Sequence, residues 1–177
     1  MADQKQGAAS TAAPKTKIGQ IGTSLPIVYR LFFLLIEPIS ALVGAYYAQF
    51  GQSEYLRLTH AASAPATESS SIPTGTSIVL SQLANLYFFF ALNEAIVLRS
   101  TSDLRVWKAV LFCLLVADFG HLYTLRELGL DIYWSVARWN AIHYGNIPFV
   151  VLGACFRLAF IAGVGINTSQ GKRKVKK

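Results

Sequence analysis

The sequence has few charged residues: Asp, Glu, Lys and Arg make up 14% of its 177 residues, whereas hydrophobic residues make up 53%. Soluble domains carry about 25% charged residues, so this composition excludes an ordinary soluble protein. Cysteine is also scarce, since only Cys113 and Cys155 are present and both lie in hydrophobic stretches. A disulfide framework is therefore excluded, and two free thiols are expected.

The common signatures of cofactor-binding enzymes are missing as well. There is no aspartate-rich pair that would hold magnesium on a diphosphate, no P-loop and no glycine-rich dinucleotide turn. A metal site could be drawn from His121, His143, Asp118 and Asp131, but these residues do not have a recognised ligand spacing. We expect neither a metal nor a cofactor.

Long hydrophobic stretches are what the sequence does have. Four of them hold roughly 20 or more mostly apolar residues, the length that an α-helix needs to cross about 30 Å of hydrocarbon: residues 26–50, 77–98, 105–125 and 146–166. We predict an all-α membrane protein, a four-helix transmembrane bundle within residues 23–167. Residues 1–22 have little to bury and predict a disordered tail, and residues 168–177 form a basic tail.

The net charge of +7 is distributed unevenly. Lysines and arginines precede the first stretch, flank the connection 99–104 and end the chain, whereas the other two connections carry no excess of positive charge. This pattern predicts four helices with both termini cytoplasmic, and the basic tail suits anionic lipid better than nucleic acid. The endoplasmic reticulum is the default membrane.

The connections differ in length. Residues 99–104 are so few that the second and third helices must be antiparallel neighbours. Residues 51–76 are rich in Ser, Thr, Ala and Pro and predict a flexible loop. Within 131–144, Trp134, Trp139 and Tyr144 stand among polar residues, which favours a short interfacial helix before the fourth span.

Five ionisable residues interrupt the hydrophobic stretches: Glu37, Glu94, Asp118, His121 and Arg157. A charge in hydrocarbon costs at least about 2.5 kcal/mol, so such residues face the bundle interior or a wet cavity. Glu37 and Arg157 fall at similar depths and predict an ion pair across the bundle, which favours a structural lock. Pro38 frees a backbone carbonyl and can kink the first helix.

The second helix carries Gln82, Asn85, Asn93 and Glu94. Hydrogen bonds between helices are a sufficient explanation for the three amides. Glu94 lies near the cytoplasmic end, where it could pair with Arg99 or Lys108, and both a functional and a structural role stay open for it.

Asp118 and His121 are the strongest candidates for chemistry. They are three residues apart on one helix face and can hydrogen-bond, and a carboxyl beside an imidazole in an apolar pocket suits a proton donor and its partner. The alternative is a clasp between helices. We expect the substrate to contact polar and aromatic residues nearby: Asn93, Tyr123, Trp139, Asn140, His143, Asn146 and Arg157. Trp139 equally suits a membrane boundary.

Four motifs carry a resemblance to a known family: Ile36-Glu37-Pro38, Asn93-Glu94-Ala95, the segment 117–121 (ADFGH), and Trp139-Asn140 followed by 144–146. Over residues 25–166 the chain resembles small fungal four-helix membrane proteins classed as a domain of unknown function. It is also similar to the membrane-bound terpene cyclases of fungal meroterpenoid pathways, of the ascofuranone and macrophorin type. A more distant similarity of layout is to sterol-isomerase-like proteins.

The cyclase resemblance implies protonation of an epoxide or olefin on a farnesylated ring. We therefore predict a membrane-embedded terpene cyclase or isomerase that acts on a lipid-soluble isoprenoid. Asp118 would be its acid, His121 would tune or reprotonate that acid, and Glu94 or Glu37 would be the final base. A non-catalytic lipid-binding or scaffold protein remains the alternative, and it predicts that every buried acid is paired. A proton-coupled transporter would require an oligomer.

Overall fold

The computed structural model describes residues 25–67 and 71–166, and these residues form helices and no strands. Four helical segments are long and apolar enough to cross a membrane: Ile27–Phe50, Thr74–Ser100, Leu104–Leu128 and Ala141–Ile161. The predicted four-span architecture is confirmed. The fourth span begins at Ala141 and not at residue 146. The two predicted tails lie outside the described residues.

Three of the four spans contain a π-helical turn. The first span consists of α1 (Ile27–Leu31), η1 (Phe32–Ile36) and α2 (Glu37–Phe50). The second consists of α4 (Thr74–Leu92), η3 (Asn93–Val97) and α5 (Leu98–Ser100). The third is α6 (Leu104–Thr124) with η4 (Leu125–Leu128), and the fourth is α7 (Ala141–Tyr144), η7 (Gly145–Phe149) and α8 (Val150–Ile161).

The π-helical turn η1 ends directly before Glu37 and Pro38. Proline lacks an N–H, so the carbonyl of Leu34, four residues earlier, loses its helical donor. Nη2 of Arg99 donates to this carbonyl at 2.5 Å. The second span thereby satisfies a backbone group that the proline of the first span leaves unpaired.

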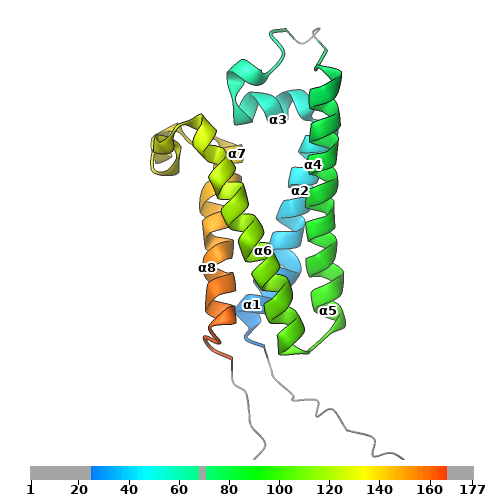
Figure 1. Ribbon diagram of the computed structural model, residues 1–177, viewed down its shortest axis with the longest axis vertical. Coiled ribbons are helices and arrows are strands. Elements are labelled where there is room, and N and C mark those ends of the chain that lie inside the picture. Colours follow the sequence, from blue (N-terminus) through cyan, green and yellow to red (C-terminus); the bar gives the residue numbers. More distant parts are fainter. Residues whose placement is uncertain (1–24, 68–70, 167–177) are drawn as a thin grey trace, which may run out of the picture.

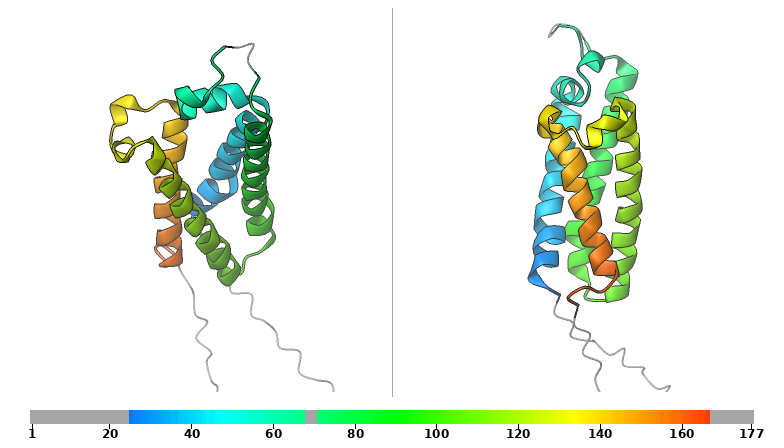
Figure 2. Two further views of the ribbon diagram at one scale, coloured as in Figure 1. Left: turned by 45° about the horizontal axis from the view of Figure 1, so that its top comes forward. Right: turned by 90° about the vertical axis from the view of Figure 1, so that its left-hand side faces the viewer.

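The helices are arranged as two antiparallel pairs, α2 with α4 and α6 with α8. In the first pair, Gly44 lets α4 approach closely, because a Cβ at this position would lie 3.3 Å from the Tyr87 ring. Ala48, one turn farther, is fully buried. Between the two pairs, close contacts are concentrated at the ends of the bundle, and the pairs diverge along most of their length (Figures 1 and 2).

An aromatic core joins the two pairs at the end of the bundle where α1 begins and α8 ends. Its buried members come from all four spans: Tyr29, Phe32, Phe33, Leu98, Trp107, Leu111, Leu114 and Phe160. Two hydrogen bonds to backbone close this end. The Tyr29 hydroxyl donates to the Val164 carbonyl at 3.0 Å, and Nζ of Lys108 donates to the Ile161 carbonyl at 2.8 Å.

A short helix, α3 (Gln52–Thr59), crosses the opposite end of the bundle (Figure 1). The Tyr55 hydroxyl of α3 is hydrogen-bonded to that of Tyr87 at 3.2 Å, and burial raises the pKa of the Tyr55 phenol. The expectation of a flexible loop over 51–76 is therefore wrong for 52–59. Leu56 and Tyr55 face the bundle, and this half-buried packing orders the segment.

The segment before the fourth span also differs from its prediction. Residues 130–138 form two short 3-10 turns, Leu130–Tyr133 and Val136–Arg138, instead of one interfacial helix. Asn140 then starts α7 by accepting from the N–H groups of Ile142 and His143. Its Nδ2 donates to the Leu58 carbonyl of α3 at 2.7 Å, and this hydrogen bond joins the start of α7 to α3.

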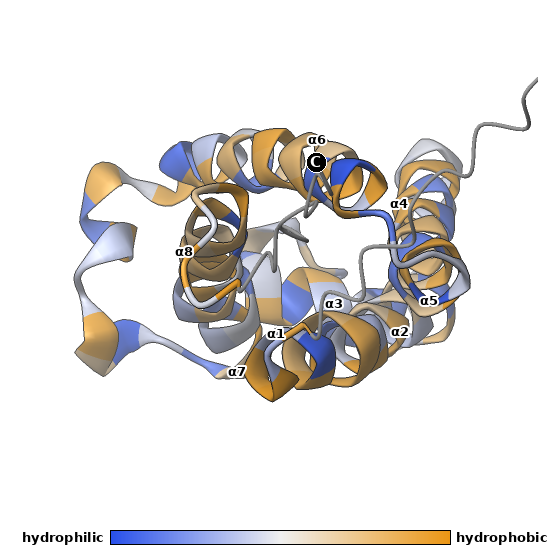
Figure 3. Cartoon of the chain, turned by 90° about the horizontal axis from the view of Figure 1, so that it is seen from below, coloured by the Kyte–Doolittle hydropathy of each residue, from blue (hydrophilic) through white to orange (hydrophobic). Residues whose placement is uncertain are grey.

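Residues of high hydropathy occur along all four spans in the view along the bundle (Figure 3), and many of the large apolar ones are exposed. Large apolar residues are at least half exposed on every span, among them Ile39, Phe89, Phe112, Val116 and Leu158. Water would disfavour such a surface, whereas lipid accepts it. The protein is therefore a membrane protein by its surface as well as by the length of its helices.

Candidate functional site

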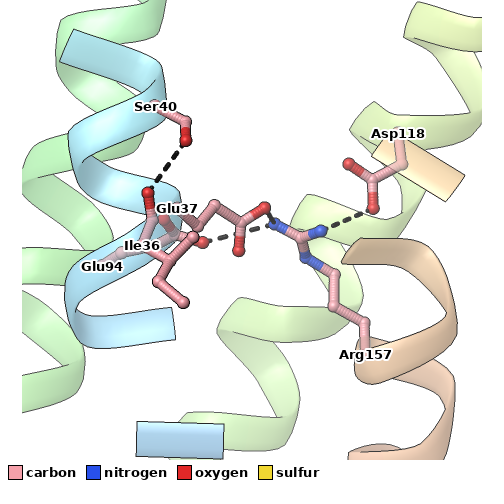
Figure 4. Close-up of polar contacts among 6 residues, drawn as sticks. All are labelled: Ile36, Glu37, Ser40, Glu94, Asp118 and Arg157. Carbon is pink, nitrogen blue, oxygen red and sulfur yellow. Dashed lines mark hydrogen bonds and ion pairs between the residues drawn. The ribbon is translucent and has the colours of Figure 1, made fainter. Parts of the chain in front are cut away.

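Arg157 of α8 lies at the centre of a buried cluster of charged side chains (Figure 4). Nη1 donates to Oδ2 of Asp118 at 2.7 Å, and Nη2 donates to Oε1 of Glu37 at 2.5 Å and to Oε1 of Glu94 at 3.2 Å. The predicted pair of Glu37 with Arg157 is confirmed. The expected pairing of Glu94 with Arg99 or Lys108 is wrong, because Glu94 faces the interior.

Each member of the cluster comes from a different span. Glu37 begins α2, Glu94 lies in the π-helical turn η3, Asp118 lies in α6 and Arg157 lies in α8. Arg157 therefore bonds to one acid in its own helix pair and to two in the opposite pair. The ring of Phe33 lies 5.8 Å from the guanidinium carbon, so the cluster rests on the aromatic core. The guanidinium links the two pairs where their backbones are apart.

The cluster is almost fully enclosed and unbalanced in charge. The side chains of Arg157 and Glu94 are 3% and 2% exposed, and those of Glu37 and Asp118 are 14% and 13% exposed. A guanidinium stays protonated in proteins, so three ionised carboxylates around it would carry a net charge of −2. Because isolated charge is strongly disfavoured in a low-dielectric interior, neutrality requires two protons among the three carboxyls.

Gly153 makes room for this arrangement. Side chains on a helix point toward its N-terminus, so Arg157 reaches back over the residue four positions earlier. A Cβ at residue 153 would lie 2.7 Å from Nη1 of Arg157 and 3.3 Å from Oε1 of Glu37. Sequence reasoning missed this residue, although a glycine four residues before a buried arginine was a readable signal.

Several polar atoms of the cluster have no hydrogen-bond partner. Oε2 of Glu37, Oε2 of Glu94 and Nε of Arg157 are all fully buried and unpaired among the described residues. Oδ1 of Asp118 also lacks a hydrogen bond there, but it is not among the fully enclosed atoms. Of the three acids, Asp118 is therefore the one whose unpaired oxygen is the most accessible.

His121 lies on α6 one turn beyond Asp118. No hydrogen bond joins the two side chains in the described part of the chain, and Oδ2 of Asp118 is bound to Arg157 instead. The expected Asp118–His121 pair is therefore wrong in this structure. The Asn146 side chain interacts with the imidazole, while Nε2 of His121 is buried and unpaired.

The other predicted contact residues lie away from the cluster. Asn93 donates to the Phe89 carbonyl of its own helix, and Tyr123 is 62% exposed beneath the guanidinium of Arg126. Trp139 donates to the Ile132 carbonyl at 2.7 Å. Asn140 and His143 form a capping box at the start of α7. Trp139, Asn140 and His143 thus each make a hydrogen bond to the backbone.

Residues 22–167 match DUF7704, a domain of unknown function. The chain belongs to the DUF7704 family. No curated protein and no solved structure matches it. The DUF7704 domain covers all four spans and every member of the Arg157 cluster, so the cluster lies within the family's own domain.

Proposed function

We propose that this DUF7704 protein is a membrane-embedded proton-transfer enzyme, a cyclase or isomerase that acts on a lipid-soluble isoprenoid. The observation that carries the proposal is the excess of carboxyls over guanidinium groups in the buried cluster. A structural lock needs one acid for one arginine, whereas three acids around Arg157 hold protons that can be donated. The isoprenoid class comes from the sequence resemblance.

In this proposal Asp118 is the proton donor. Its Oδ2 is fixed by Nη1 of Arg157 at 2.7 Å, which leaves Oδ1 to meet the reacting atom. General acids act within hydrogen-bond distance of that atom. The proton adds to an epoxide oxygen or an olefin carbon, the resulting cation cyclises or rearranges, and a carboxylate of the cluster, Glu37 or Glu94, takes up the released proton. The substrate and the product therefore have the same mass.

The orientation of the bundle is part of the proposal, with both termini cytoplasmic and the endoplasmic reticulum as the membrane. At the end of the bundle that α3 crosses, arginines are paired with neighbouring acids, as Arg57 is with Glu54 and Arg126 with Glu127. The Glu54 carboxylate has a lowered pKa because Arg57 donates to it. At the other end, Arg99 and Lys108 bond to backbone carbonyls and keep an uncompensated charge, which suits the cytoplasmic side.

The test is a turnover assay in microsomes that contain the full chain, with farnesylated phenols and their epoxides as substrates. A product of unchanged mass that disappears in Asp118→Asn would support the proposal. Glu127→Gln is the matched control, because it removes an exposed carboxylate far from the cluster and should keep full activity. Folding of each variant is checked by its chromatographic profile in detergent.

A second function is favoured by a specific observation: each of the three acids already contacts Arg157. This is what a non-catalytic lipid-binding or scaffold protein requires. A folded protein that converts none of the isoprenoids, and whose Asp118→Asn variant loses only stability, would replace the enzyme by this alternative.

A further inference from the structure

The outward face of α4 carries a regular seam that nothing in the described chain covers. Its positions alternate in steps of four and three residues, the spacing of the interface positions in a left-handed coiled coil. All of them are exposed: Ile78, Gln82, Asn85, Phe89 and Leu92. We call these five residues the α4 seam.

The opposite face of α4 has a seam of the same spacing that is already occupied. Leu80, Ala84 and Ala91 are buried against α2, and Tyr87 packs on Gly44. Residues 80 and 82 differ by two positions, which is about 200° around a helix. The α4 seam therefore faces away from the bundle, toward lipid.

Gln82 and Asn85 make this face unusual for a lipid-exposed surface. They lie eight and eleven residues after the start of the span Thr74–Ser100, about 12 and 16 Å into it at the helical rise. Neither side chain has a hydrogen-bond partner in the part of the chain that the structure describes. Lipid tails offer none, and polar groups in hydrocarbon seek partners on neighbouring helices. Both amides were expected to bond within the bundle, and the structure shows that they do not.

The geometry points to a second copy of this chain as the partner, in a parallel dimer formed by the two α4 seams. Two copies in one membrane share an orientation, so a two-fold axis along the membrane normal brings equivalent residues to equal depth. Gln82 then meets Gln82 of the other copy, and Asn85 meets Asn85. A carboxamide has both donors and an acceptor, so each amide pairs with its own equivalent.

The surface beside the amides has a shape that suits this partner. Gln82, Asn85, Leu86, Phe88, Phe89 and Leu92 line a shallow hollow of about 570 Å³ on the outer face. Apolar side chains of an adjacent helix can enter it while the amides bond beside them. A polar residue at a seam position also fixes the register and the number of helices. The interface leaves the Arg157 cluster untouched, so it is independent of the proposed enzyme.

The test measures energy transfer between labelled copies of the full chain in liposomes, over a range of protein-to-lipid ratios. Replacing both amides, Gln82→Leu with Asn85→Leu, should weaken association about 30- to 1,000-fold, because each of the two amide contacts contributes roughly 1–2 kcal/mol in membranes. Gln49→Leu is the matched control, since it removes an exposed amide on α2 outside the seam. Wild-type protein that stays monomeric, or a dimer that the double change leaves intact, would overturn the proposal.

Cross-linking locates the interface independently of the amides. In a background with Cys113→Ala and Cys155→Ala, Phe89→Cys should form a disulfide-linked dimer on oxidation. Phe112→Cys, which is 57% exposed on α6, should not. A cross-link through residue 112 in place of residue 89 would refute the α4 seam as the interface.

Discussion

Alanine in place of Gly153 tests whether the guanidinium of Arg157 is held in one position. The new Cβ would lie 2.7 Å from Nη1 of Arg157, so the guanidinium must shift, and the shift lengthens its 2.7 Å bond to Asp118. Overpacking a filled interior costs about 1–3 kcal/mol, and alanine recovers up to about 1 kcal/mol of helix propensity. We expect Gly153→Ala to lower the free energy of unfolding by about 1–2 kcal/mol.

The assay is denaturation by sodium dodecyl sulfate in mixed micelles, followed by helical circular dichroism. Gly120→Ala is the matched control, because no atom lies within 4 Å of a Cβ built there. It should raise stability by up to about 1 kcal/mol through helix propensity alone. The same substitution, glycine to alanine, should therefore lower the free energy of unfolding at residue 153 and raise it at residue 120.

A double-mutant cycle separates the clash from any general effect on α8. In an Arg157→Met background the guanidinium is gone, so Gly153→Ala should be neutral or stabilising. The coupling between the two changes should lie within the 0.5–3 kcal/mol seen for residues in contact. If the two effects are additive, the guanidinium does not occupy the space above residue 153 and the reasoning fails.

Three further tests concern the other buried and interhelical polar contacts. Glu94→Gln should preserve the free energy of unfolding to within about 1 kcal/mol, because two of the three carboxyls must be protonated and a glutamine amide can replace one of these neutral groups. Arg157→Met, in contrast, should cost about 3–5 kcal/mol. A larger loss in Glu94→Gln would contradict the charge count. Asn140→Ala should cost about 1–2 kcal/mol by removing the cap of α7, and amide hydrogen exchange should rise there first. Arg99→Met should cost about 1 kcal/mol by leaving the Leu34 carbonyl without its donor, and Pro38→Ala should restore part of this loss by supplying an N–H. Thermal unfolding without such a rescue would refute the link.

The sequence by itself determined the membrane character, the number of spans and the pairing of Glu37 with Arg157. Hydrophobic stretches near 20 residues have one low-energy solution in lipid, a helix that satisfies its own backbone. Glu37 and Arg157 are opposite charges at similar depth on helices that must meet, so their attraction could be read from their positions. That Pro38 frees a backbone carbonyl followed from its missing N–H alone.

Only the tertiary structure decided which side chains share the interior. Asp118 and His121 are neighbours on one helix face, yet Asp118 bonds to Arg157 of another helix, because the permanently charged guanidinium donates strong charge-assisted hydrogen bonds in a low-dielectric interior. Glu94 turns inward and Gln82 and Asn85 turn outward, although all three lie on the second span. Helical periodicity fixes their relative angles, but the rotation of the whole helix is set by packing against α2, where Gly44 and Ala48 admit Tyr87 and its neighbours.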